Sequence, residues 1–211
     1  ERHQIGDVNN DGNIDVIIGN NRDGGVNWYE GLGARASSGH LWERHKISIS
    51  DENMPRVYDL ETGDFDNDGD IDIAVAGYTG GHVVLLENPG PQNVHAHWSQ
   101  YIIAEKMPYV RTLKIVDIDN DGFLDILAGS EGNPVSKVPL HEKDPKHHGA
   151  YLRWIKNPGY FPKDLFTSIT HDDEFRWKIH DIDTATRAVG HSALADMDGD
   201  GDTDVVTTFG M

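Results

Sequence analysis

The strongest constraint on this chain is an aspartate-rich segment that occurs four times. The copies are GDVNNDGNID (6–15), GDFDNDGDID (63–72), VDIDNDGFLD (116–125) and ADMDGDGDTD (195–204). Their first aspartates are 57, 53 and 79 residues apart, and the last interval is longer because residues 131–150 form an insertion. A spacing of about 50 residues between copies of one segment predicts a repeat architecture.

Each segment is flanked by short runs that have the composition of β-strands. An apolar run follows it (VIIG, IAVAG, ILAG, VVTT), and then a run that ends in a turn (GGVNWYEG, GHVVLLENPG, AYLRWIKNPG). A run with tryptophan and isoleucine comes third, and a run that opens with valine leads into the next segment. β-Branched and aromatic residues between Gly, Pro and Asn favour strands. Four strands in each repeat predict an all-β fold, a β-propeller of four-stranded blades.

We expect residues 1–211 to form a single β-propeller domain or a fragment of one, with the insertion at 131–150. The repeats account for about four blades, and propellers contain about four to eight. We expect seven blades in the complete propeller, so that the remaining blades lie outside this sequence.

The repeated segment has the pattern of a calcium-binding loop. Numbered from its first aspartate, positions 1, 3, 5 and 9 carry Asp or Asn, position 6 is always Gly, and position 7 varies. Ca²⁺ takes about six to eight oxygen ligands, which alternating carboxylates on a tight turn supply, and position 7 would add its backbone carbonyl. The alternative is a solvated acidic turn. We predict up to four Ca²⁺ sites, formed by Asp7, Asn9, Asp11, Asn13, Asp15, Asp64, Asp66, Asp68, Asp70, Asp72, Asp117, Asp119, Asp121, Phe123, Asp125, Asp196, Asp198, Asp200, Asp202 and Asp204.

These loops and their flanks resemble the FG-GAP/VCBS family of calcium-binding propeller repeats, which includes the integrin α-subunit head, fungal lectins and several polysaccharide lyases. The resemblance covers nearly the whole chain apart from residues 131–150 and implies the fold and the ion, not an activity. The ENPG ending of the third strand, with tryptophan and isoleucine after it, also resembles the propeller domain of aldos-2-ulose dehydratase. The integrin branch fits less well because no Phe-Gly-Gly-Ala-Pro-like stretch is present.

We expect function on the face opposite the calcium loops, because loops on a rigid scaffold carry it. Aligning the inner strands on their valines places Tyr58, Arg111 and His191 at the mouth of the central channel, at positions that differ between repeats. Arg111 would neutralise a uronate carboxylate while His191 or Tyr58 removes the proton α to it, which gives β-elimination. The alternative is that Arg111 pairs with a neighbouring acid and that the other two side chains are packed.

The insertion adds three histidines to the same face: His141, His147 and His148. With His191 nearby, they would ligate Zn²⁺ or another transition metal. The alternative is a solvated surface loop.

The sequence therefore predicts a calcium-stabilised propeller that acts on carbohydrate as a lyase or dehydratase. The alternative is a non-catalytic module that binds glycan or protein, as lectin and integrin-like propellers do. A net charge of −18 argues against nucleic acid as a partner, and no apolar run is long enough for membrane insertion. No signal peptide is visible, but millimolar calcium outside cells suits such loops, so we expect an extracellular or periplasmic protein.

Overall fold

The computed structural model describes residues 2–20, 25–47, 56–77, 81–132, 150–159, 176–183 and 189–209. These residues form fourteen strands and one short 3₁₀ helix, η1 (Gly33–Ser38). The strands are β1 (Arg2–Gly6), β2 (Asp15–Gly19), β3 (Val26–Glu30), β4 (Glu43–Ile47), β5 (Val57–Gly63), β6 (Asp72–Gly77), β7 (His82–Glu87), β8 (Ser99–Ala104), β9 (Val110–Val116), β10 (Asp125–Ser130), β11 (Leu152–Lys156), β12 (Lys178–Asp183), β13 (Val189–Ala195) and β14 (Asp204–Phe209).

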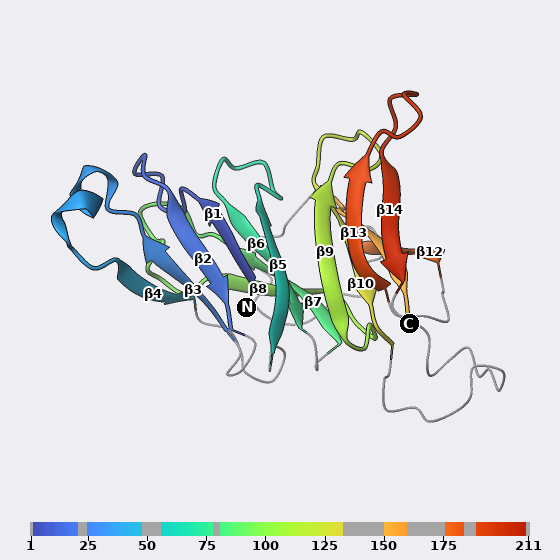
Figure 1. The fold of residues 1–211 in the computed structure, drawn as a ribbon, viewed down its shortest axis with the longest axis horizontal. Coiled ribbons are helices and arrows are strands. Elements are labelled where there is room, and N and C mark those ends of the chain that lie inside the picture. Colours follow the sequence, from blue (N-terminus) through green and yellow to red (C-terminus); the bar gives the residue numbers. More distant parts are fainter. Residues whose placement is uncertain are drawn as a thin grey trace.

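The strands form antiparallel sheets that follow one another along the chain. Three sheets have four strands, in the orders β1-β2-β3-β4, β5-β6-β7-β8 and β9-β10-β11-β12, and β13 pairs with β14. The first strands of the sheets are neighbours, since β5 contacts both β1 and β9, and β9 contacts β13. Figure 1 shows the four sheets side by side in chain order. The predicted all-β repeat is confirmed, and the described residues form an open, propeller-like row rather than a closed ring.

Apolar side chains fill the space between successive sheets. All six residues of β6 and all six of β10 are buried, which explains their almost continuous apolar runs. Trp28 and Trp98 are each 1% exposed and pack in the core between the first two sheets, and Phe65 lies in the core between the second and third. Full burial of one large apolar side chain stabilises the fold by about 1.5–3 kcal/mol, so these cores hold neighbouring sheets together.

A glycine at or near the end of the second strand allows the next sheet to approach closely. A Cβ atom on Gly19 would lie 2.3 Å from Cγ1 of Val57, and one on Gly129 would lie 2.6 Å from Cγ1 of Val189. Val57 and Val189 open β5 and β13, and both are fully buried. The glycine and the valine that recur in the sequence therefore form one contact between adjacent sheets.

The insertion lies between β10 and β11, the second and third strands of the third sheet, as the sequence predicts. Its residues 133–149 are outside the described residues. Among the residues that are described, no helix is long and apolar enough to cross a membrane.

Candidate metal centres

The four aspartate loops connect the first and second strands of each sheet, β1–β2, β5–β6, β9–β10 and β13–β14 (Figure 1). In the first three loops, position 4 is an asparagine with φ between 54° and 59°, and position 6 is a glycine with φ between 86° and 92°. In the fourth loop both positions are glycine, with φ of 78° and 94°. Gly and Asn are the residues that best tolerate this left-handed region, so the turn favours one of them at each of the two positions.

The first aspartate of each loop organises the turn around its carboxylate. In the second loop, Asp64 Oδ1 accepts the backbone N–H of Asp68 at 3.1 Å, and Asp64 Oδ2 accepts that of Gly69 at 2.9 Å. Asp7 and Asp117 accept the equivalent pairs in the first and third loops, and Asp196 accepts a similar pair in the fourth. Each loop therefore has its first ligand position fixed by its own backbone.

Three of the four loops bring the carboxylates of positions 1, 3 and 9 together. One oxygen from each residue lies within 4.8 Å of the other two in the triads Asp64/Asp66/Asp72, Asp117/Asp119/Asp125 and Asp196/Asp198/Asp204. The first loop has an amide at position 3, so Asp7, Asn9 and Asp15 supply two carboxylates and one amide oxygen. This donor set consists of hard oxygen ligands, which suit Ca²⁺ better than a thiophilic or nitrogen-preferring ion.

Positions 5 and 7 lie on the same turn and contact each other. The carboxylate at position 5 accepts the backbone N–H of position 7 at 2.8–3.1 Å in all four loops. The pairs are Asp11 with Asn13, Asp68 with Asp70, Asp121 with Phe123, and Asp200 with Asp202. In each loop, positions 1 to 7 thus lie on the turn and position 9 begins the second strand, and the converging side-chain oxygens of the three triads come from positions 1, 3 and 9.

The aspartate at position 9 begins the second strand and is buried in the first three loops. Asp72 is 1% exposed, and its carboxylate accepts backbone N–H groups from Phe65 at 3.0 Å and from Asn88 at 2.9 Å. Burial raises the pKa of Asp72 to about 8, and burial together with the nearby charge of Asp68 raises the pKa of Asp66 to about 6. A carboxylate that is costly to ionise in the fold is stabilised in its charged form by a bound cation.

Two buried asparagines connect adjacent loops and were missed from the sequence. Asn88 is 2% exposed, and its Nδ2 donates to the carbonyl oxygen of Val8 in the first loop at 2.9 Å and to that of Ile71 at 3.2 Å. Asn157 is fully buried and donates in the same way to Phe65 in the second loop at 2.9 Å and to Leu124 at 3.0 Å. We call these residues the asparagine latches. Their recurrence in ENPG and KNPG is the signal that could have identified them.

The residue before each latch differs between sheets and changes the charge at the loop. In the third sheet Lys156 Nζ contacts the carboxylates of Asp119 and Asp121, and this contact lowers the pKa of Asp121. The matching residue of the second sheet is Glu87, whose negative charge adds to the rise in the pKa of Asp66. The Lys156 ammonium group therefore pairs with two carboxylates of the third loop, whereas the second loop has an additional acid, Glu87, beside it.

Tyr58, Arg111 and His191 lie near the starts of β5, β9 and β13. The Arg111 guanidinium lies over the Tyr58 ring, 5.5 Å from its centroid, and forms an ion pair with Glu131. The sequence left open the alternative that Arg111 pairs with a neighbouring acid, and Glu131 is such an acid. His191 is exposed, and its backbone N–H donates to Thr208 Oγ1 at 3.0 Å. The structure thus brings Tyr58 and Arg111 together, while the predicted metal ligands His141, His147 and His148 lie outside the described residues.

Comparison with known protein families identifies the repeat unit. A family model described as an FG-GAP-like repeat matches residues 7–75 and, in a second copy, residues 64–128. Each match begins at the first aspartate of one loop and ends in the strand that follows the next loop. Together the two matches span more than half of the chain. No curated protein matches the chain.

Proposed function

The chain belongs to the FG-GAP-like repeat family, and on this premise we propose that its aspartate loops bind Ca²⁺ and that the ions stabilise a β-propeller scaffold. The observation that carries the proposal is the convergence of three carboxylates within 4.8 Å in each of three loops. Positions 1, 3 and 9 would hold the ion, with position 5 and the backbone carbonyl of position 7 as further oxygen ligands. The first loop would bind more weakly because Asn9 and Asn13 replace carboxylates.

The position of the loops explains how the ion would stabilise the fold. The carboxylate at position 9 bonds to the backbone of its own loop and to the end of the third strand, and each latch bonds to the loop of the preceding sheet. An ion at the loop would therefore fix one hairpin, and the latch would pass that order to its neighbour. The free energy of binding becomes free energy of folding, because the unfolded chain has no such site.

The experiment is thermal unfolding with and without a chelator. We expect calcium removal to lower the melting temperature markedly and Mg²⁺ to restore it only in part, because Mg²⁺ demands near-octahedral geometry and dehydrates reluctantly. The matched variant is Asp64→Asn, which should reduce the calcium-dependent part of the stability, while a change at exposed Asn93 should not. A melting temperature that is the same with and without the chelator would refute the proposal.

We further propose that residues 1–211 belong to one propeller domain of seven four-stranded blades when complete. The support is the meander of four-stranded sheets with neighbouring first strands. We also propose an extracellular or periplasmic location, because millimolar calcium there would keep loops of this kind filled.

A second candidate function is a carbohydrate site at the channel mouth. It is favoured by the contact of Arg111 with Tyr58, and by the Nε atom of Arg111, which is buried and has no hydrogen-bond partner among the described residues. A uronate carboxylate would be a suitable anion for that guanidinium, with His191 or Tyr58 as the base for a lyase or dehydratase.

This second candidate is tested with acidic and neutral glycans. A lyase produces an unsaturated sugar with new near-UV absorbance, whereas a binding module retains the glycan or protein ligand intact. Arg111→Gln should abolish either behaviour, and Lys114→Gln, a neighbouring basic residue paired with Glu61, should not. Absence of turnover and of binding across the panel would remove carbohydrate from the account and leave the calcium proposal standing.

A further inference from the structure

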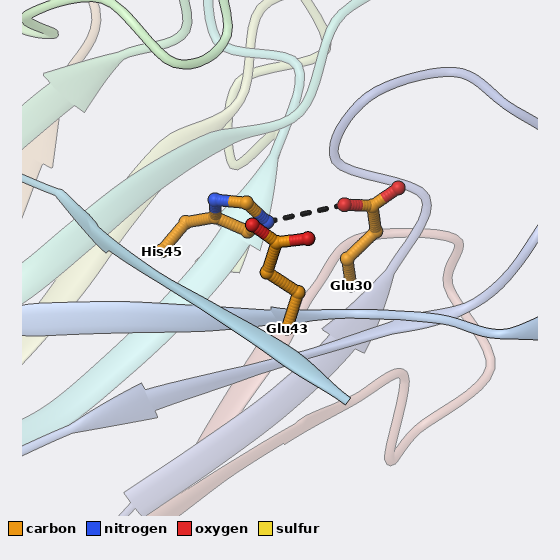
Figure 2. Close-up of side chains that lie close together, drawn as sticks. All are labelled: Glu30, Glu43 and His45. Carbon is orange, nitrogen blue, oxygen red and sulfur yellow. Dashed lines mark hydrogen bonds and ion pairs between the residues drawn. The ribbon is translucent and has the colours of Figure 1, made fainter. Parts of the chain in front are cut away.

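A second group of metal-ligating side chains lies at the paired ends of β3 and β4 in the first sheet. It is next in the chain to Gly31, whose backbone N–H donates to Asp15 of the first aspartate loop at 2.6 Å. Glu30 ends β3, and Glu43 and His45 lie on β4, which pairs with it. One ligand atom from each of the three lies within 4.8 Å of the other two. Figure 2 shows the three side chains converging, with His45 Nε2 directed at the carboxylate of Glu30.

The backbone register explains why these three residues meet. Glu30 is directly opposite Glu43, and Trp28 is directly opposite His45, in the antiparallel pair β3–β4. Side chains at alternate positions of a strand point to the same face, so Glu43 and His45 share a face. His45 Nε2 lies 3.1 Å from Glu30 Oε2, close to the separation of two atoms that are both bound at about 2 Å to one tetrahedral zinc ion.

The His45 ring is held in place from two sides. It stacks on Trp28, with ring centroids 4.3 Å apart, and its centroid lies 4.6 Å from that of His95. His95 lies in the connection that precedes β8 of the second sheet, so the packing around the His45 ring includes a residue from outside the first sheet. Positioned imidazoles that lie beside carboxylates are typical ligands of first-row transition metals.

Comparison of the three four-stranded sheets separates what the scaffold needs from what is special to this cluster. In the third sheet, Trp154 stacks on His180 at 4.6 Å, so the tryptophan–histidine pair recurs. The positions of Glu30 and Glu43 are there occupied by Lys156 and Lys178. The stacked histidine is therefore part of the scaffold, whereas the two acids beside it are not.

The second sheet also lacks the ligand set at these positions. Glu87 matches Glu30, but Ser99 and Tyr101 stand at the other two places, and the Tyr101 hydroxyl donates to Glu87 at 2.6 Å. In the first sheet, the Glu43 carboxylate converges with Glu30 and His45, and its side chain forms no hydrogen bond or ion pair within the described part of the chain. Two carboxylates thus face one imidazole without a lysine or arginine paired to either within those residues.

We infer that Glu30, Glu43 and His45 form a binding site for a divalent transition metal ion of the zinc class, with the ring of His95 packed against the His45 imidazole. The ligand set differs from that of the aspartate loops, which consist of oxygen donors. Nitrogen ligation selects against Ca²⁺ and in favour of Zn²⁺, Co²⁺ or Ni²⁺. All three ligands lie on β3 and β4, and the β7–β8 connection of the next sheet packs on the site through His95, so a bound ion would join the ends of β3 and β4.

The experiment is a titration of the full chain with Zn²⁺ in saturating Ca²⁺, which keeps the aspartate loops occupied. Co²⁺ serves as a spectroscopic probe, because its visible absorption intensifies in a tetrahedral site with nitrogen ligands. We expect one equivalent of Zn²⁺ to bind, and Glu43→Gln and His45→Gln each to weaken it by at least about tenfold, as loss of a ligand should exceed loss of an outer-shell partner. His95→Ala should weaken it less than either change, because His95 packs on the His45 ring and is not among the converging ligands.

Matched controls exist in the sister sheets. His180→Gln removes the equivalent stacked histidine, and Glu87→Gln removes the equivalent acid, so both should leave Zn²⁺ binding unchanged. Calcium-dependent melting curves of all variants establish that each one is folded. Because Glu43 is exposed, its replacement should leave the fold intact. The inference is overturned if the Glu43 and His45 variants bind Zn²⁺ as the unaltered chain does, or if no Zn²⁺ binds. It is also overturned if replacing His141, His147 and His148 by alanine abolishes the signal.

Discussion

Replacing the latch Asn88 by alanine tests how adjacent sheets are coupled. The Asn88 side chain donates to the carbonyl oxygens of Val8 and Ile71 and accepts the backbone N–H of Gly90 at 3.0 Å. The side chain is 2% exposed, so alanine would leave these groups buried without this partner. A buried polar group that loses its partner costs about 1–3 kcal/mol. Because the turn can relax or admit water at some of these three groups, we expect the free energy of unfolding to fall by about 3 kcal/mol in total.

The assay is chemical and thermal unfolding in saturating Ca²⁺. For a chain of this size, about 3 kcal/mol corresponds to a fall in melting temperature of roughly 6–12 °C. Asn93→Ala in the same turn is the matched control, because Asn93 is exposed and its change should stay within about 0.5 kcal/mol. If Asn88→Ala is no more destabilising than this control, the latch does not couple the sheets and the reasoning is wrong.

Three further outcomes follow from the structure. Lys156→Gln should raise the calcium affinity of the third loop, because the ammonium no longer occupies its carboxylates; calorimetric titration measures this, and unchanged or weaker binding would contradict it. The pKa of Asp72 is raised from 3.8 to about 8, so its contribution to the stability of calcium-free protein is present below about pH 4 and is lost as the pH rises through about 8. Calcium-free protein should therefore unfold at lower urea at pH 8 than at pH 5, and the stabilisation by calcium should increase over the same range; the reverse trend would refute this assignment. Gly129→Ala should destabilise the protein because the new Cβ meets Val189 at 2.6 Å, and an unchanged urea midpoint would show that the contact is not tight.

Much of the fold was predictable because its determinants are local and repeated. The loop spacing, the strand runs and the glycine at position 6 each occur at matching places in the repeats, and the structure confirms four-stranded antiparallel sheets. The left-handed conformation of Asn10 and its counterparts at position 4 also has a local signal, because asparagine or glycine occupies that position in every loop. The number of blades is not determined by such local signals.

The less predictable features depend on contacts between sheets. Asn88 reads as an ordinary turn residue, and its bond to Val8 spans 80 residues of sequence. The cluster of Glu30, Glu43 and His45 depends on the register of β3 with β4, since the residues are separated by η1 and its flanks. No sequence motif joins Glu30 to Glu43 and His45. The predicted metal site in the insertion, by contrast, rests on histidines that are close together in the sequence.

The most direct test of the central claim is the calcium stoichiometry of the intact chain. Calorimetric titration of chelator-treated protein should detect up to four bound ions, with the first and third loops weakest, and Asp64→Asn combined with Asp72→Asn should remove one ion from the total. Binding of no calcium, or an unchanged count in that double variant, would contradict the account.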